Sequence, residues 1–121
     1  MKTAPRVLVV EDHEVTLDAL TLLFEKEGFV VDGAGTVAEA SDHFNSEAPS
    51  VALIDIGLPD GNGIQLLDRL KAKHPKVPVI VVTASDEKRF VDEAIKRGAF
   101  CFMHKPYGFA DLLAVVRDAL K

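Results

Sequence analysis

Short apolar runs alternate with longer amphipathic stretches along the whole chain. Each apolar run holds four to six residues and is rich in β-branched side chains, which is typical of strands buried on both faces of a sheet. The stretches between them repeat their apolar residues at helical spacing. The predicted strands are 6–10, 29–34, 51–54, 79–82 and 100–103.

Glycines and capping residues mark the ends of the predicted helices. The first helix covers about 14–27 and ends at Gly28, a residue that favours a helix C-terminus. Thr36 and Glu39 form a capping-box pattern at the start of the second helix. Before the fourth helix, the candidate caps are Ser85 and Asp86.

Five strand-then-helix units with short connections predict an α/β fold. This alternation is typical of a doubly wound parallel sheet with helices on both faces. A closed eight-unit barrel needs a longer chain than the 121 residues present. We therefore expect one domain over residues 1–121.

Composition and charge narrow the classes of function. The chain has 14 Lys and Arg against 19 Asp and Glu, a net charge of −5, so we expect no direct binding of nucleic acid. Cys101 is the single cysteine and cannot form an internal disulfide, which fits a reducing compartment. No apolar run approaches the roughly 20 residues of a membrane span, and no signal-peptide core opens the sequence. We expect a cytoplasmic protein without a membrane partner.

Polar residues follow four of the predicted strands at their carboxyl ends. Glu11 and Asp12 follow the first strand, Asp55 the third, Thr83 the fourth and Lys105 the fifth. Ligands bind beyond these ends in open parallel sheets, so we expect the five side chains to lie together. Each pair of carboxylates about 4 Å apart costs on the order of 4 kcal/mol at a dielectric near 20. The acids therefore need a cation or a proton, and their oxygens suit Mg²⁺ or Mn²⁺.

A simpler explanation remains for each acid taken singly, because strand-end carboxylates are often solvated at a loop edge. The occurrence of all five residues at one predicted edge favours a site. Four motifs, in this order, resemble those of receiver domains of two-component response regulators: Leu8 to Glu14, Leu53 to Gly63, Val81 to Ser85, and Gly98 to Pro106. The resemblance covers nearly the whole chain and implies the flavodoxin-like strand order 2-1-3-4-5.

The resemblance also implies a role for each residue at the predicted edge. Asp55 is the phosphoacceptor, and the donor is a phosphohistidine of a sensor histidine kinase or phosphotransfer protein. Lys105 and Thr83 contact the phosphoryl oxygens. The implied metal ligands are Glu11, Asp12, Asp55 and the backbone carbonyl of Gly57, and the implied amide donors are Ile56 and Ala84. Such a domain is not an enzyme beyond its own phosphotransfer and slow self-dephosphorylation.

The same resemblance implies a conformational switch. Thr83 moves toward the phosphoryl group and Phe102 turns inward to fill the vacated space; the alternative is that Phe102 is an ordinary core residue. The peptide bond between Lys105 and Pro106 is expected to be cis. The face made by the fourth helix, fifth strand and fifth helix is expected to meet an output partner or a second receiver in a homodimer.

Three other classes of protein compete with this interpretation. A phosphohydrolase of the dehalogenase type also uses an Asp nucleophile, but it needs a second Asp where this chain has Gly57. A flavodoxin-like FMN-binding protein needs a hydroxyl-rich phosphate loop where Glu11 and Asp12 would repel phosphate. A pseudo-receiver would act through protein contacts without phosphate, which the intact set of five residues disfavours.

Overall fold

Five parallel strands form the central sheet of the computed structural model, which describes residues 4–84 and 88–121. The strand order is β2-β1-β3-β6-β7, which confirms the order 2-1-3-4-5 for the five predicted strands. Predicted and observed bounds differ by no more than one residue at either end of a strand. The strands are Arg6–Val10 (β1), Val30–Ala34 (β2), Val51–Asp55 (β3), Val79–Thr83 (β6) and Cys101–His104 (β7).

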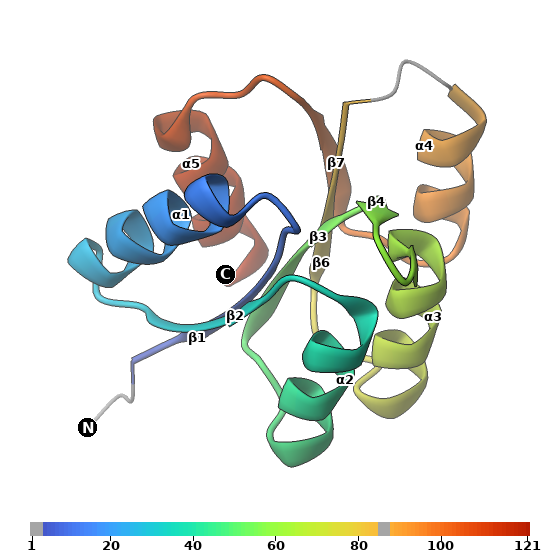
Figure 1. Cartoon of the computed structure of the whole chain (residues 1–121), viewed down its shortest axis with the longest axis horizontal. Helices are drawn as coiled ribbons and strands as arrows, with labels where there is room; N and C mark the ends of the chain where they lie inside the picture. Colours follow the sequence, from blue (N-terminus) through green and yellow to red (C-terminus); the bar gives the residue numbers. More distant parts are fainter. Residues whose placement is uncertain (1–3, 85–87) are drawn as a thin grey trace.

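Helices cover both faces of this sheet, as the alternating pattern predicts. Two helices, α1 and α5, lie together on one face, and α2, α3 and α4 lie on the other (Figure 1). Among the described helices, none combines the length and the apolar character that crossing a bilayer requires. The helices are Glu14–Lys26 (α1), Val37–Ser46 (α2), Gly63–Lys73 (α3), Lys88–Lys96 (α4) and Phe109–Ala119 (α5).

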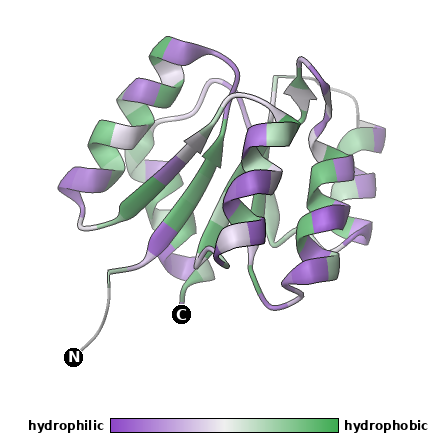
Figure 2. Cartoon of the chain, turned by 60° about the horizontal axis from the view of Figure 1, so that its bottom comes forward, coloured by the Kyte–Doolittle hydropathy of each residue, from purple (hydrophilic) through white to green (hydrophobic). Residues whose placement is uncertain are grey.

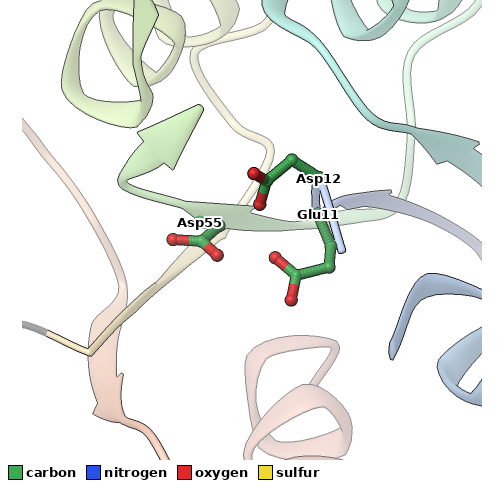
Figure 3. A group of neighbouring side chains, drawn as sticks. All are labelled: Glu11, Asp12 and Asp55. Carbon is green, nitrogen blue, oxygen red and sulfur yellow. The ribbon is translucent and has the colours of Figure 1, made fainter. Parts of the chain in front are cut away.

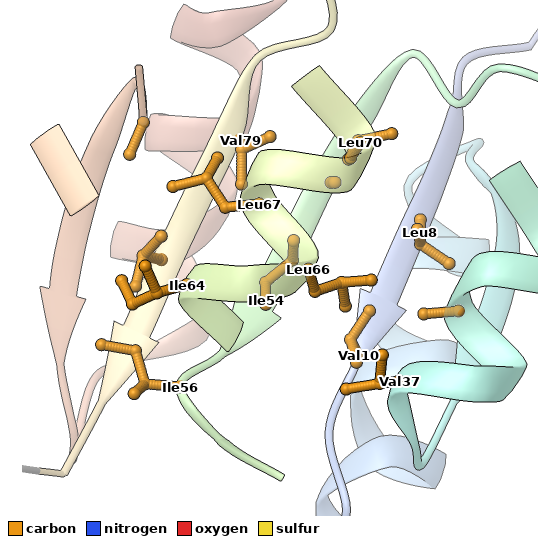
Figure 4. Packing of buried hydrophobic residues seen from close by; sticks show 14 of the residues in the cluster. Leu8, Val10, Val37, Ile54, Ile56, Ile64, Leu66, Leu67, Leu70 and Val79 are labelled. Carbon is orange, nitrogen blue, oxygen red and sulfur yellow. The ribbon is translucent and has the colours of Figure 1, made fainter. Parts of the chain in front are cut away.

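The sheet separates two hydrophobic clusters. Val7 and Val9 of β1 pack with residues of α1 and α5, whereas Leu8 and Val10 point to the opposite face and pack with α2 and α3 (Figure 4). Apolar residues therefore occupy successive positions of a strand, as the strands between the helices in Figure 2 illustrate. Burying each such side chain contributes about 1.5–3 kcal/mol, so the sheet is a firm platform for the loops at its edge.

Glycines and a capping threonine mark helix ends at the predicted positions. Gly28 follows α1 with φ of +89°, and Gly98 follows α4 with φ of +101°, a region of backbone space that favours glycine. The Thr36 hydroxyl caps α2 by accepting a hydrogen bond of 3.1 Å from the Glu39 amide. The candidate caps Ser85 and Asp86 lie outside the described residues.

The loop after β3 contains a small hairpin that the sequence pattern does not reveal. Gly57–Leu58 (β4) pairs antiparallel with Gly61–Asn62 (β5). Two-residue strands rich in glycine carry no hydrophobic periodicity. The hairpin returns the chain to β3 at Gly63, where an added Cβ would lie 2.4 Å from the Asp55 carbonyl oxygen. Only glycine fits so close an approach, which keeps the hairpin against the end of β3.

Candidate functional site

The carboxyl edge of the sheet brings together the side chains that the sequence places after the strands. Asp55 and Thr83 are the last residues of β3 and β6, Glu11 and Asp12 follow β1, and Lys105 follows β7. Parallel pairing puts all these strand ends on the same side. The predicted grouping of carboxylates and lysine at one edge is therefore confirmed.

Three carboxylates converge at this edge. Oxygen atoms of Glu11, Asp12 and Asp55 all lie within 4.8 Å of one another, and Figure 3 shows them facing a common space. Glu11 is only 4% exposed and Asp55 8%, whereas Asp12 is exposed. The group is thus buried on its inner side and reachable from solvent on the side of Asp12.

Lys105 holds two of the carboxylates from the inner side. Its Nζ donates to Glu11 Oε1 at 2.9 Å and to Asp55 Oδ2 at 2.7 Å. The other oxygen of Glu11, Oε2, is buried and has no hydrogen-bond partner in the described part of the chain. One ammonium group therefore contacts two of the three carboxyl groups, and among the described residues one buried oxygen has no partner.

This crowding shifts the titration of the acids in opposite directions. Burial, reinforced by the hydrogen bond with Asp55, raises the pKa of Glu11 to about 7, although Lys105 opposes the rise. Burial also acts to raise the pKa of Asp55, but hydrogen bonds from Glu11, Lys105 and the Gly57 amide outweigh it and lower that pKa below its ordinary value. Of these two acids, Glu11 therefore holds a proton more readily than Asp55.

The donor set fits a hard divalent cation. Carboxylate oxygens are the ligands of Mg²⁺ and Mn²⁺, and an incomplete protein cage suits Mg²⁺, which keeps several waters. The unpartnered buried oxygen of Glu11 is an acceptor that a metal-bound water would satisfy. Asp12 is exposed, so an ion can reach its carboxylate directly from solvent. The residues present are thus able to hold Mg²⁺.

A cavity of about 510 Å³ opens beside Asp55. Thr83, the last residue of β6, is among the residues that line this cavity and is only 3% exposed. Five residues predicted to contact or accept a phosphoryl group line this cavity: Asp55, Ile56, Thr83, Ala84 and Lys105. Gly57, whose backbone carbonyl is a predicted metal ligand, lines it as well.

Two backbone amides follow Asp55, and one of them, that of Ile56, is the predicted donor to a phosphoryl group. The Ile56 amide donates to the Val82 carbonyl oxygen at 3.1 Å, as a continuation of the sheet. The next amide, that of Gly57, is the one directed at the acceptor, since it donates to Asp55 Oδ1 at 3.0 Å. Sheet pairing of β3 with β6 therefore extends one residue further than the sequence pattern reveals and engages the Ile56 amide.

The neighbouring strand β7 orients the predicted switch residue. Phe102 is 40% exposed, while its neighbours Cys101 and Met103 pack against the hydrophobic cluster on the α1–α5 face of the sheet. Phe102 is therefore not a core residue in this structure, and the alternative that it belongs to the core is wrong. The peptide bond between Lys105 and Pro106 is cis, as expected.

Two residues near the site escape sequence reasoning. Tyr107 lines a cavity of about 10 Å³ beneath Glu11 and Asp55, and burial raises the pKa of its hydroxyl. Asp60, in the turn of the hairpin, accepts hydrogen bonds from two amides of α2. An Asp between Pro59 and Gly61 has the composition of any turn, so its sequence context gave no signal of this distant contact.

A doubly wound parallel sheet with an acidic, lysine-bridged site at its carboxyl edge defines the class of the protein. The profile of the response regulator receiver domain family matches residues 7–117. The chain belongs to this family and is a receiver domain of two-component signalling.

Individual relatives agree with this assignment. The virulence transcriptional regulatory protein PhoP of Salmonella typhimurium is 33% identical over 116 residues, which cover 96% of this chain and 52% of PhoP. The transcriptional regulatory protein PmrA of Pectobacterium parmentieri matches with the same identity and coverage. This chain thus spans about half the length of these curated relatives.

Solved structures extend the likeness to three dimensions. A CheY-like response regulator receiver domain protein from Methanospirillum hungatei JF-1 superposes with a TM-score of 0.94 at 31% identity. The superposition covers 97% of this chain and 94% of that one. The flavodoxin-like fold predicted from the motifs is therefore confirmed.

Proposed function

We propose that this chain is a phosphorylation-activated switch in which Asp55 accepts a phosphoryl group from a phosphohistidine of a sensor histidine kinase or a phosphotransfer protein. The observation that carries the proposal is the position of Lys105, whose Nζ lies 2.7 Å from Asp55 Oδ2 at the mouth of the cavity. A lysine held there neutralises charge on the acceptor and on the incoming phosphoryl oxygens.

The transfer forms one bond and breaks another. A carboxylate oxygen of Asp55 attacks phosphorus in line, the P–N bond to the donor histidine breaks, and the histidine nitrogen keeps the electron pair. Lys105 and the Thr83 hydroxyl are positioned to stabilise the phosphoryl oxygens, and the amides of Gly57 and Ala84 are the backbone donors of the proposed site. No general base is required, because the Asp55 carboxyl group, with its lowered pKa, is already ionised.

Four groups would hold Mg²⁺: the carboxylates of Glu11, Asp12 and Asp55 and the backbone carbonyl of Gly57. When bound, Mg²⁺ supplies positive charge that offsets the repulsion between the acids and the phosphoryl group. Asp12, exposed beside the other two acids, suits a direct ligand. Buried Glu11 suits a contact through water, because Lys105 already occupies one of its oxygens.

The readout of phosphorylation is proposed to pass through Thr83 and Phe102. A phosphoryl group adds about −1.5 to −2 charges and draws the Thr83 hydroxyl toward Asp55. Phe102, 40% exposed and paired in register with Val81 of β6, then has a space to enter. Phe102 is in equilibrium between an outward and an inward position. The size of the shift toward the inward position is set by how much more favourably the phosphoryl group interacts with that state than with the outward one.

The face that includes α4, β7 and α5 is the proposed surface for an output partner or for a receiver homodimer. Ile95 of α4 is 47% exposed, and Phe100 and Phe102, beside and within β7, are 46% and 40% exposed. These apolar side chains are available for contact, and the switch residue is one of them. Phosphorylation is therefore proposed to change this surface directly.

Incubation with a small acyl phosphate, with and without Mg²⁺, tests the proposed function. We expect one acid-stable, base-labile phosphoryl group per chain, formed only with Mg²⁺. Repeated release of inorganic phosphate would indicate a phosphohydrolase of the dehalogenase type instead, although Gly57 offers no acid for that reaction. Absence of labelling in every condition would favour a pseudo-receiver.

A further inference from the structure

The β4–β5 hairpin makes contacts with two different parts of the molecule. At one end, the Gly57 amide donates to Asp55 Oδ1 at 3.0 Å, and the Gly63 amide donates to the Ile56 carbonyl oxygen at 2.8 Å. At the other end, the turn residue Asp60 reaches the amino terminus of α2. The hairpin therefore connects the phosphoacceptor to a helix on the α2–α3 face of the sheet.

Asp60 completes the capping of α2. Its Oδ1 accepts from the Val37 amide at 2.7 Å and its Oδ2 from the Ala38 amide at 3.2 Å. The local cap, Thr36, takes the next amide, that of Glu39. These first amides of a helix have no partners within the helix, and the positive end of the helix dipole favours a carboxylate. The backbone hydrogen bonds from Val37 and Ala38 accordingly lower the pKa of Asp60.

We propose that Asp60 is a positioning residue for the Asp55 site: by fastening the hairpin to α2, it holds Gly57 in place against the phosphoacceptor. This inference rests on the proposed function and adds to it a residue that touches neither the phosphoryl group nor the metal. Asp60 itself is exposed and lies outside the residues that line the cavity beside Asp55.

The hairpin needs such an anchor because it is too small to hold its own shape. Each strand has two residues, and isolated two-stranded hairpins are marginal in water even when longer. Leu58 of β4 is buried in the hydrophobic cluster beneath α2 and α3, which holds the first strand, and a Cβ on Gly61 would lie 3.2 Å from Val37 Cγ2. The turn between the two strands is fastened to α2 by the hydrogen bonds of Asp60. Without the Asp60 hydrogen bonds, we expect the hairpin to sample other positions, and the Gly57 amide and carbonyl to move with it.

Magnesium titration of three variants by calorimetry tests this role. Asp60→Ala removes both hydrogen bonds to α2, whereas Asp60→Asn keeps one carbonyl oxygen as an acceptor. Thr36→Ala is the matched control, because it removes the other cap of the same helix without touching the hairpin. Supporting groups around a metal site typically change its affinity by 10-fold or more, so we expect about a tenfold weaker Mg²⁺ affinity for Asp60→Ala and a smaller loss for Asp60→Asn.

Two further readouts separate positioning from general destabilisation. In labelling with acetyl phosphate, Asp60→Ala should need more Mg²⁺ for half-maximal rate while the rate at saturating Mg²⁺ changes less. Amide hydrogen exchange at Gly57 should be faster in Asp60→Ala and unchanged in Thr36→Ala. Thr36→Ala should lower the unfolding temperature yet bind Mg²⁺ like the wild type.

Equal Mg²⁺ affinity in the wild type and both Asp60 variants would overturn the inference. So would an equal loss of affinity in Thr36→Ala, because the effect would then come from α2 stability alone. If Asp60→Ala does not fold, Asp60→Asn decides by the same comparison. Failure of the proposed function looks different, because the wild-type protein itself would then neither bind Mg²⁺ nor accept a phosphoryl group.

Discussion

At the amino end of β1, Arg6 donates to both oxygens of the Asp32 carboxylate at 2.9 Å, and the nearby Glu47 is well exposed to solvent. At the carboxyl end of the same strand, Glu11 is buried; its Oε1 accepts from Lys105, and its Oε2 has no hydrogen-bond partner among the described residues. Both regions are rich in charge. Only the second leaves a buried acceptor unsatisfied among the described residues.

This difference separates a structural ion pair from a binding site. In the Arg6–Asp32 pair a single guanidinium nitrogen, Nη1, donates to both carboxylate oxygens, so each oxygen of Asp32 has a partner. A carboxylate cluster with too few cations is stable only with a shared proton or a bound metal. The amino end of the sheet therefore stabilises the fold, and the carboxyl end is available for chemistry.

Removing the phosphoacceptor should give the largest contrast between the two ends. Asp55→Asn should abolish Mg²⁺-dependent labelling by a small acyl phosphate, because an amide is not a competent nucleophile in this transfer. Asp32→Asn, which alters the carboxylate that pairs with Arg6, should retain full labelling. Intact-protein mass spectrometry measures both. Full labelling of Asp55→Asn would show that another residue is the acceptor.

Removing the central lysine should destabilise the metal-free protein strongly. Lys105→Met leaves the buried Glu11 and Asp55 carboxyl groups without their cation, and we expect a loss of about 1–3 kcal/mol in the free energy of unfolding. Urea unfolding in the presence of a chelator measures this loss. Added Mg²⁺ should restore part of it. An equal loss with and without Mg²⁺ would mean that the ion does not bind among these carboxylates.

The raised pKa of Glu11 makes metal-free stability depend on pH. The folded state holds a proton on Glu11 up to a pKa of about 7, whereas the unfolded chain releases it near 4.5. This contribution is fully present below pH 4.5 and is lost as the pH rises through 7. With a chelator present, the unfolding temperature should therefore be higher at pH 5.5 than at pH 7.5.

Glu11→Gln is the control for this pH dependence, since the amide keeps the shape of the side chain and does not titrate. The difference in unfolding temperature between pH 5.5 and pH 7.5 should shrink in this variant. Asp55 does not contribute to the difference in unfolding temperature between pH 5.5 and pH 7.5, because its lowered pKa means that it takes up a proton only at more acidic pH. The same difference in the wild type and in Glu11→Gln would assign the dependence to another group.

Breaking the ion pair at the amino end should have the smallest effect on the site. Arg6→Gln removes the bidentate contact with Asp32, and we expect a modest decrease in the unfolding temperature. Calorimetric affinity for Mg²⁺ should match that of the wild type. A large change in Mg²⁺ affinity would show that the two ends of β1 are coupled through the sheet.

Strand-end chemistry was predictable because apolar runs define both the strands and their ends. Glu11, Asp55 and Thr83 follow such runs directly. Because parallel strands end at the same edge of a sheet, the sequence alone predicts that these three residues lie at one edge. The resemblance to receiver domains then implied a role for each residue. Those roles for Asp55, Thr83 and the metal ligands stay predictions until they are measured.

Local register and side-chain direction were not predictable in the same way. The sequence does not reveal that sheet pairing extends one residue beyond β3, where it engages the Ile56 amide, or that the Gly57 amide donates to Asp55. The outward position of Phe102 depends on which face of β7 meets the helices, and the pattern of that short strand leaves both options open. The contact of Asp60 with α2 joins segments 22 and 23 residues apart and has no local signature.

A crystal structure determined with Mg²⁺ tests the central claim most directly. We predict an ion between the carboxylates at the carboxyl edge, about 2.0–2.1 Å from oxygens of Asp12 and Asp55, with Lys105 still beside Asp55. Glu11 should face a water bound to the ion. An ion-free edge at saturating Mg²⁺, with the three carboxyl groups turned away from one another, would contradict the account.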